Sequence, residues 1–214
     1  MRLDAVLAHL LLINQVVGGL RRVQTVTVRR GRPPAGPERR DALVLAAYRR
    51  LAAAGFEGLR LRDVATQVGI DHSSIHHHFP SKQNLVVAVV DEATRQFWST
   101  TPKEGSAVDR LRGHLAALGR KIVEQPELHV VLRELDLRAR RDPELREIIA
   151  SREEGWRNSL RALLIGAAAD GGLTPSVDPS AGAELIIATV KGASLNRAHA
   201  EDILGLLDRL LIRA

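Results

Sequence analysis

Residues 59–82 constrain the fold of this chain more than any other stretch, because they hold two short helical patterns separated by a glycine. The first pattern places three apolar residues on one helical face: Val64, Ala65 and Val68. Gly69 predicts the end of that helix, since glycine adopts the left-handed conformation easily. Asp71 is predicted to cap a second helix by accepting a backbone N–H, and Ile75 and Phe79 face the first helix. Two helices joined by such a turn predict a helix-turn-helix.

The outward face of the second predicted helix carries no acidic residue. Its positions are polar and either short or planar: His72, Ser73, Ser74, His76 and His77. A face of this kind can approach the phosphate-lined major groove of double-stranded DNA, where base edges offer hydrogen bonds. These residues are therefore the candidate base-reading positions.

The positive charge of the chain is concentrated around this segment. The 214 residues carry a formal net charge of +6. Residues 21–82 hold 12 basic and 5 acidic residues, whereas residues 83–214 hold 18 basic and 19 acidic ones. A basic block beside a nearly neutral remainder indicates a phosphate-binding module. A solvated basic face is the alternative that charge alone leaves open.

The remainder of the chain predicts helices almost to its end. A first helix begins near Pro37 and runs to Gly55, with proline in the first turn, where its missing N–H is not needed. Later helices are expected at about 82–98, 106–124, 127–140, 143–170, 179–198 and 201–213. Aromatic residues make up only 3% of the chain, which disfavours an aromatic-rich β-barrel or sandwich. The absence of cysteine excludes disulfides and Cys-ligated zinc and suits a reducing cytosol.

The first 35 residues do not fit this helical pattern. Residues 3–20 form an apolar run that is short for a membrane span and lacks the features of a signal peptide. A short amphipathic helix and an artefactual or poorly ordered extension both remain open, and the weak alternation over 23–28 is the one strand candidate. Arg30 and Arg32 belong to a basic arm that is predicted to contact DNA, in the minor groove or at phosphates.

A longer stretch resembles a known family. The ordering Gly-Phe, Asp-Val-Ala, Val-Gly-Ile and Phe-Pro-Ser-Lys, over about residues 38–86, closely resembles the N-terminal domain of TetR-type transcriptional repressors. The resemblance implies an all-α fold: an N-terminal extension and basic arm (1–35), a three-helix helix-turn-helix DNA-binding domain (36–84) and a helical ligand-binding and dimerisation domain (85–214). It also implies a cytoplasmic repressor that a small-molecule effector releases from a palindromic operator.

The resemblance implies roles for individual residues as well. Base edges would be approached from the start of the recognition helix, by His72, Ser73 and Ser74, with His77 nearby on the same side. Lys82, at the start of the next helix, would contact a backbone phosphate. Two positions depart from the family pattern. His76 replaces a tyrosine that touches phosphate, and an imidazole adds charge when it is protonated, so pH-dependent DNA binding is expected. Arg60 replaces a threonine that caps a helix and touches phosphate, and its guanidinium is expected to replace the phosphate contact.

Several larger polar or aromatic side chains after residue 85 could line a small-molecule cavity of the kind that this family encloses. They are Trp98, His114, His129, Arg133, Asp136, Trp156 and Asn158. For each of them, packing in the core or at the surface is the alternative. Trp156 is the strongest candidate, because a lone large ring among Ala and Leu often forms the wall of a cavity.

The last two predicted helices are apolar on nearly all sides, so both faces need a cover. The core of the domain supplies one cover, and the same surface of a second subunit is predicted to supply the other, in a two-fold homodimer. The predicted interface consists of Leu185, Ile186, Val190, Leu207, Leu210 and Leu211. A helix pair packed inside a monomer is the alternative.

No pattern in the sequence predicts an enzyme: a Gly-rich phosphate loop, a nucleophile elbow and a His-Glu metal motif are all missing. His76, His77 and His78 are adjacent on a helix, so their side chains point about 100° apart and cannot all bind one metal ion. His72 and His76 lack a third ligand, so neither a metal site nor a cofactor is expected. The remaining rival is a helical membrane- or protein-interaction module that uses residues 3–20.

Overall fold

The structure, a computed structural model, describes residues 36–213 apart from the side chains of Phe97 and Trp98. In this range the chain is all-α, as predicted, and its β contact is one isolated bridge between Leu173 and Ile212. No helix in the range is both long and apolar enough to cross a bilayer. The predicted extension lies outside the described residues, together with its apolar run 3–20, the alternation over 23–28, Arg30 and Arg32.

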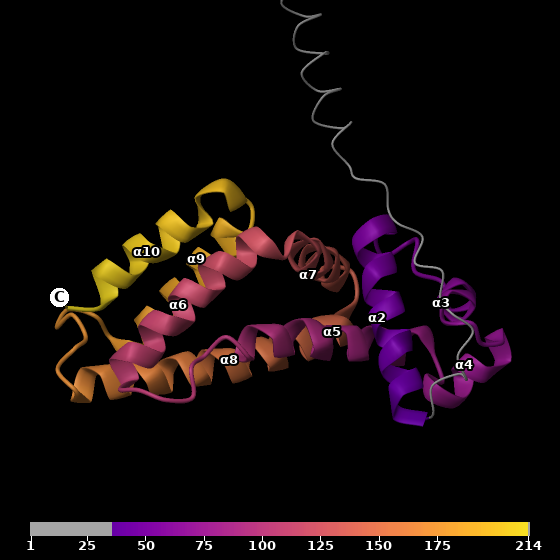
Figure 1. The fold of residues 1–214 in the computed structure, drawn as a ribbon, viewed down its shortest axis with the longest axis horizontal. Coiled ribbons are helices and arrows are strands. Elements are labelled where there is room, and N and C mark those ends of the chain that lie inside the picture. Colours follow the sequence, from indigo (N-terminus) through magenta and orange to yellow (C-terminus); the bar gives the residue numbers. More distant parts are fainter. Residues whose placement is uncertain (1–35, 214) are drawn as a thin grey trace, which may run out of the picture. The chain divides into compact units, whose positions relative to one another are not determined.

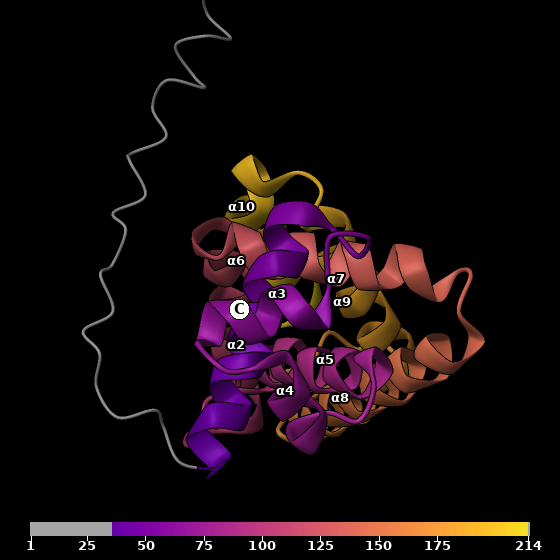
Figure 2. The ribbon, with the colours of Figure 1, turned by 90° about the vertical axis from the view of Figure 1, so that its right-hand side faces the viewer.

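The first three helices form the predicted helix-turn-helix unit. They are α2 (Gly36–Ala54), α3 (Leu61–Val68) and α4 (His72–His78). Helix α2 packs against α3, and α3 packs against α4 (Figure 2). Gly69 ends α3 in the left-handed conformation, with φ of 77°, and the Gly69 and Ile70 amides satisfy the last carbonyls of the helix. The predicted glycine turn is confirmed.

The predicted side-chain cap at Asp71 is wrong. Asp71 occupies the N-cap position of α4 with an extended backbone, but its side chain accepts no backbone N–H of the helix. The carboxylate is exposed and left to solvent, and the Asp71 carbonyl accepts from Ser74 N at 2.9 Å instead. The recognition helix is therefore held by backbone hydrogen bonds and by the burial of Ile75 and Phe79.

Six α-helices follow within the described range. They are α5 (Lys82–Trp98), α6 (Ala107–Glu124), α7 (Pro126–Ala139), α8 (Pro143–Ala169), α9 (Pro179–Ala193) and α10 (Ala200–Leu211), with a 3₁₀ turn, η1 (Arg197–His199), before α10. Helices α6 and α10 lie side by side, and α8 packs against α9 and α6 (Figure 1). Helices α5 and α7 both pack against α2 and α8, so residues 36–213 belong to one compact unit.

Local capping interactions define where several of these helices begin. Ser106 and Asp109 form a capping box at the start of α6. Asp142 and Asp178 cap α8 and α9, each with proline as the first helical residue. Such caps satisfy backbone N–H groups that have no partner inside the helix. The predicted helix starts near 106, 143 and 179 follow from these caps.

Helix α9 is shorter than the predicted 179–198. It ends at Ala193, where Ser194 Oγ donates to the Lys191 carbonyl at 2.7 Å. The Leu195 and Asn196 amides then bond three residues back, and the tightened chain enters η1. The side-chain hydrogen bond competes with the helical backbone pattern, which explains the early end.

Candidate nucleic-acid interface and ligand pockets

The outer face of α4 carries the predicted base-reading residues. Four of them are exposed: His72, Ser73, His76 and His77. Ser74 is half-buried, whereas Ile75 and Phe79 are buried beneath α4 and anchor it. The helix therefore presents hydroxyl and imidazole groups outward, in the arrangement that a recognition helix needs.

The ring of His76 has a defined orientation. Its Nδ1 lies 3.3 Å from the carbonyl oxygen of Pro80, and the ring meets that of His72 edge-on at 5.3 Å between centroids. A carbonyl only accepts hydrogen bonds, so Nδ1 carries the proton of the neutral ring. Nε2 then donates only when the ring is protonated. A phosphate contact from Nε2 of His76 in this orientation therefore requires the imidazolium form.

Lys82 begins α5, at the predicted phosphate contact. Its Nζ donates to the Phe56 carbonyl oxygen at 3.2 Å and lies 4.5 Å from the centre of the Phe56 ring. Partial burial lowers the pKa of Lys82 below its usual value; Glu57 opposes this effect and Arg138 adds to it. An ammonium group has three N–H donors, so donors remain for a phosphate while Nζ keeps its hydrogen bond to the Phe56 carbonyl.

Two side chains of helix α7 also contact Phe56. Glu134 Oε2 accepts from the Phe56 N–H at 3.1 Å, and the Arg138 guanidinium lies 4.8 Å from the centre of the Phe56 ring. Phe56 thus connects α7 with Lys82. Glu134 and Arg138 were not among the predicted residues, although their i,i+4 spacing on one helix face was a signal that could have found them.

Arg60 stands at the N-cap of α3 with an exposed side chain that makes no cap hydrogen bond. The turn before α3 is held from α2 instead. Arg50 Nη2 donates to Asp63 at 2.7 Å and to the Gly58 carbonyl at 3.3 Å. The guanidinium of Arg60 is therefore left at the surface beside the helix-turn-helix.

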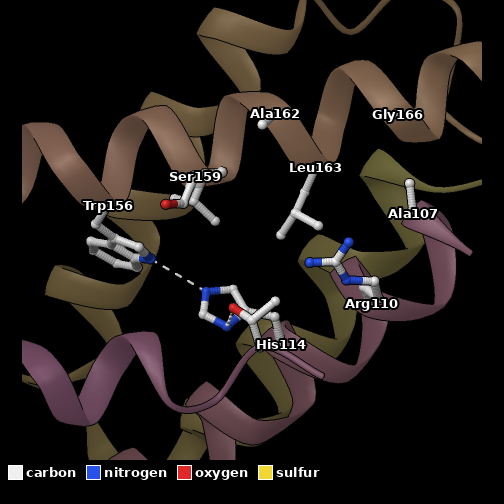
Figure 3. A pocket seen from close by; sticks show the side chains of 10 residues that line it. Ala107, Arg110, His114, Trp156, Ser159, Ala162, Leu163 and Gly166 are labelled. Carbon is white, nitrogen blue, oxygen red and sulfur yellow. Dashed lines mark hydrogen bonds between the residues drawn. The ribbon is translucent and has the colours of Figure 1, made fainter. Parts of the chain in front are cut away.

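A pocket of about 500 Å³ lies between α6 and α8, and we call it the α6–α8 pocket (Figure 3). Its apolar wall consists of Ala107, Leu160, Ala162, Leu163 and Gly166. Its polar groups come from Thr101, Arg110, His114, Trp156 and Ser159. A Cβ at Gly166 would lie 2.7 Å from the Ala107 Cβ, so glycine is needed for the close approach of α6 and α8 here.

His114 is 1% exposed, and hydrogen bonds hold its ring on both sides. Trp156 Nε1 donates to Nε2 at 3.3 Å. The hydroxyls of Thr100 and Thr101 lie 2.8 and 3.1 Å from Nδ1. Because Nε2 accepts, the proton of the neutral ring lies on Nδ1, which donates to a threonine oxygen. Burial lowers the pKa of His114 to about 4, so the ring is neutral at neutral pH.

A second pocket, of about 590 Å³, lies among α5, α7, α8 and α9, and we call it the α7–α8 pocket. His129, Arg133 and Asp136 line it, and Trp156 lines both pockets. His129 is 3% exposed; burial lowers its pKa to about 4, and the nearby Arg197 adds to the effect. Charged groups of both signs line this pocket: Arg133, Glu134, Asp136, Arg140, Arg152, Glu153 and Lys191.

The predicted pocket residues are thus divided between two pockets. Asn158 lines neither of them and is exposed. Trp98 ends α5, and its side chain lies outside the described part of the structure. Three polar residues of the α6–α8 pocket were not predicted: Thr101, Arg110 and Ser159. Arg110 lies one helical turn before His114, and that spacing was its available signal.

The predicted dimer residues fall into two groups. Leu185 and Leu210 are 47% and 58% exposed, on the outer faces of α9 and α10. The other four are buried in the core of this chain, which corrects the predicted interface: Ile186, Val190, Leu207 and Leu211. Leu206, one turn before Leu210, is exposed and was not predicted. Apolar residues occur on every side of α9 and α10, so no helical periodicity in the sequence separates the core face from the outer face.

The fold and these sites define a class of protein. A helix-turn-helix with an exposed polar recognition face is a DNA-binding unit. Pockets of about 500 and 590 Å³ are large enough for a small molecule. The combination is typical of ligand-responsive regulators of transcription.

Comparisons with known proteins identify the family. Residues 43–89 match the bacterial regulatory proteins of the tetR family, and residues 107–206 match the C-terminal domain of BetI-type transcriptional repressors. The HTH-type transcriptional repressor KstR2 of Mycolicibacterium smegmatis is 25% identical over 150 residues, which cover 68% of this chain and 73% of that protein. The chain belongs to the TetR family of DNA-binding transcriptional regulators.

Solved structures show the same fold. A TetR-family regulator from Rhodococcus sp. is 26% identical, with a TM-score of 0.71 over 81% of this chain and 98% of that one. A TetR regulator from Chloroflexus aurantiacus is 24% identical, with a TM-score of 0.71 over 83% of this chain and 98% of that one. The likeness therefore extends over both the helix-turn-helix and the helices that form the pockets.

Proposed function

We propose that this chain represses transcription as a homodimer bound to a palindromic operator, and that a small molecule in its helical domain releases it from DNA. The exposed polar face of α4, anchored by the buried Ile75 and Phe79, carries the proposal. His72, Ser73 and His77 would read base edges, while Arg60 and Lys82 would contact phosphates. Such a regulator works in the cytoplasm, where the bacterial chromosome lies.

The outer faces of α9 and α10 support a dimer. Exposed apolar or small residues recur at helical spacing along α9 and the turn after it: Ala181, Leu185, Ala188, Gly192 and Leu195. On α10, Leu206 and Leu210 are 51% and 58% exposed. An apolar surface of this kind is typical of an interface, and a two-fold arrangement would pair it with itself. The two α4 helices would then enter successive major grooves, roughly 34–36 Å apart.

Two helices provide a physical link between the pockets and DNA. Helix α5 begins with Lys82, and the loop directly after it holds Thr100 and Thr101 against His114. Helix α7 lines the α7–α8 pocket with Glu134, which also accepts from the Phe56 N–H. A ligand that shifts either helix would move the helix-turn-helix. By linkage, DNA and ligand then weaken each other's binding by the same factor.

Operator selection from random DNA, followed by fluorescence anisotropy, tests the DNA-binding part of the proposal. We expect a palindromic site whose binding weakens steeply with salt, because phosphate contacts release counterions. Ser73→Asp should abolish binding by placing a carboxylate in the groove. Ser151→Asp, at an exposed position of α8, is the matched control and should bind normally. Absence of any specific, salt-sensitive binding would contradict the proposal.

Light scattering coupled to size-exclusion chromatography tests the dimer. Leu185→Glu should yield a monomer, because it places a charge in the proposed interface. Leu45→Glu, on α2, replaces a leucine of similar exposure, 45% against 47%, and should remain dimeric. A wild-type chain that is monomeric would contradict the proposed arrangement on a palindrome.

A further inference from the structure

We infer that the effector is a small carboxylic acid whose carboxylate binds Arg110 and whose apolar body fills the α6–α8 pocket. The inference rests on the proposed function, since it names the chemical class of the molecule that releases DNA. It depends on the charge, the hydrogen-bonding groups and the apolar wall of this pocket.

Among the described residues that line the α6–α8 pocket, Arg110 carries the only charge. Its Nε donates to the Pro102 carbonyl at 3.1 Å, and no carboxylate of the described chain lies within 4 Å of the guanidinium. Figure 3 shows its two terminal nitrogens directed toward Leu163. A guanidinium fixed at Nε and without a carboxylate at its terminal nitrogens is suited to a bidentate carboxylate ligand.

The other polar groups of the pocket are neutral. His114 is held in its uncharged form between Trp156 and the two threonines, and burial lowers its pKa to about 4. A cationic ligand would therefore meet Arg110 with no anionic group to compensate it. Trp156 carries the one indole or phenyl ring among the described lining residues, and a single such ring does not enclose an ammonium group.

The threonine next to the histidine can assist an acid group. His114 Nδ1 carries a proton and lies 2.8 and 3.1 Å from the Thr100 and Thr101 oxygens, so it cannot accept from either hydroxyl. The hydroxyl proton of Thr101 then points away from the imidazole and can be donated to a ligand. Thr101 and Arg110 both line the pocket, so one carboxylate could accept from both.

The rest of the pocket fits an apolar chain or ring. Leu160, Ala162 and Leu163 line it from α8, and Ala107 and Gly166 lie where the two helices approach closely. The volume of about 500 Å³ lies in the range of roughly 300–1,000 Å³ that is typical of small-molecule sites. The α7–α8 pocket carries charges of both signs and so does not select one class of ligand in this way.

Isothermal titration calorimetry on the full chain tests the inference with three probes of equal chain length: octanoate, octanamide and octylamine. We expect octanoate to bind saturably and the other two to bind at least roughly 10-fold more weakly, because only the acid forms a charge-assisted pair. Arg110→Met should weaken octanoate binding roughly 10- to 100-fold and leave octanamide unaffected. Arg110→Lys keeps the positive charge but lacks the paired N–H donors of a guanidinium, so its octanoate affinity should lie between those of the wild type and Arg110→Met.

Arg120→Met is the matched control, because Arg120 lies on the same helix, is exposed and does not line this pocket. It should bind all three probes as the wild type does. Thermal unfolding of each variant verifies the fold, and Arg110→Lys keeps the test valid should Arg110→Met fail to fold. The inference is overturned if octanamide binds as tightly as octanoate, if both Arg110 variants retain wild-type affinity, or if octanoate does not bind.

Anisotropy with the selected operator separates this inference from the proposed function. Octanoate should release DNA from the wild type and from Arg120→Met, but not from Arg110→Met. If the chain binds its operator and a neutral compound releases it while octanoate does not, the ligand class is wrong and the proposed function stands. If no operator is bound at all, the proposed function itself fails.

Discussion

Three histidine side chains on α4 and two in the pocket walls occupy opposite environments. On α4, His72, His76 and His77 are exposed. In the pocket walls, His114 and His129 are 1% and 3% exposed, and burial lowers the pKa of each to about 4. The exposed rings present their ring nitrogens to solvent and to DNA, whereas the buried rings stay neutral and hold a fixed hydrogen-bonding pattern. Burial, and not residue type, separates the two roles.

The largest expected effect is a loss of stability in acid from the buried group. The pKa of His114 is lowered from 6.5 to about 4 in the folded chain. Between these values the unfolded chain binds the proton and the folded chain does not, so the free energy of unfolding falls as the pH drops through this window. The loss is on the order of 3 kcal/mol for His114. Urea denaturation at a series of pH values measures it, and an unchanged pH dependence in His114→Gln would refute the assignment.

Removing one histidine from each environment sharpens the contrast at neutral pH. His114→Leu should lower the free energy of unfolding by about 1–3 kcal/mol, because Trp156 Nε1 and a threonine hydroxyl lose a buried partner. His77→Leu should change it by less than about 0.5 kcal/mol, since the ring is exposed. Urea denaturation of both variants gives the comparison. Equal losses of unfolding free energy in the two variants would show that the hydrogen bonds of the buried His114 ring do not stabilise the fold.

On the DNA side, a base-reading residue and a phosphate-binding residue should differ in kind. Ser73→Ala should alter base preference, by up to roughly 1–3 kcal/mol at the contacted pair. Lys82→Ala should weaken binding to all DNA sequences about equally. It should also lower the slope of log affinity against log salt concentration by about 1, because one phosphate contact is lost. Parallel selections from random DNA and salt titrations distinguish these outcomes. A uniform loss from both variants would mean that the base-reading face is misassigned.

The smallest expected effect concerns the hydrogen-bonding capacity of His76. With Nδ1 facing the Pro80 carbonyl, Nε2 of the neutral ring has no proton to donate to a phosphate. His76→Tyr supplies a hydroxyl donor at this position and should strengthen DNA binding by roughly 2- to 5-fold, about the net value of one hydrogen bond. Anisotropy titrations measure the change. His72→Gln is the control for the neighbouring ring, and an unaltered affinity in His76→Tyr would exclude a phosphate contact at this position.

The helix-turn-helix was predictable because its determinants are local. Gly69, Ile75 and Phe79 act through contacts within a few residues or through a short turn, and each was assigned correctly. The end of α9 and the cap at Asp71 were assigned incorrectly. At each position a polar side chain can bind either solvent or a nearby backbone group: Ser194 binds the Lys191 carbonyl, whereas Asp71 is left to solvent. These choices leave no distinct pattern in the order of residues.

The candidate site was predictable in part. The described pockets are lined by five of the predicted residues, but their division into two pockets was not foreseen: His114, His129, Arg133, Asp136 and Trp156. Their part in ligand binding stays a prediction. Four of six predicted interface residues proved to be core residues, since α9 and α10 have apolar side chains on every face. Composition shows that a helix is buried, but not which neighbour covers each side.

The order of amino acids alone sets the helical class, the glycine turn, the uncharged face of α4 and the placement of positive charge near it. Folding in three dimensions adds the neutral state of His114, the exposure of Arg110 to the pocket and the contact of Lys82 with Phe56. The first group depends on neighbours within one or two helical turns. The second depends on desolvation by residues distant in the chain, and 42 positions separate His114 from the tryptophan that holds it.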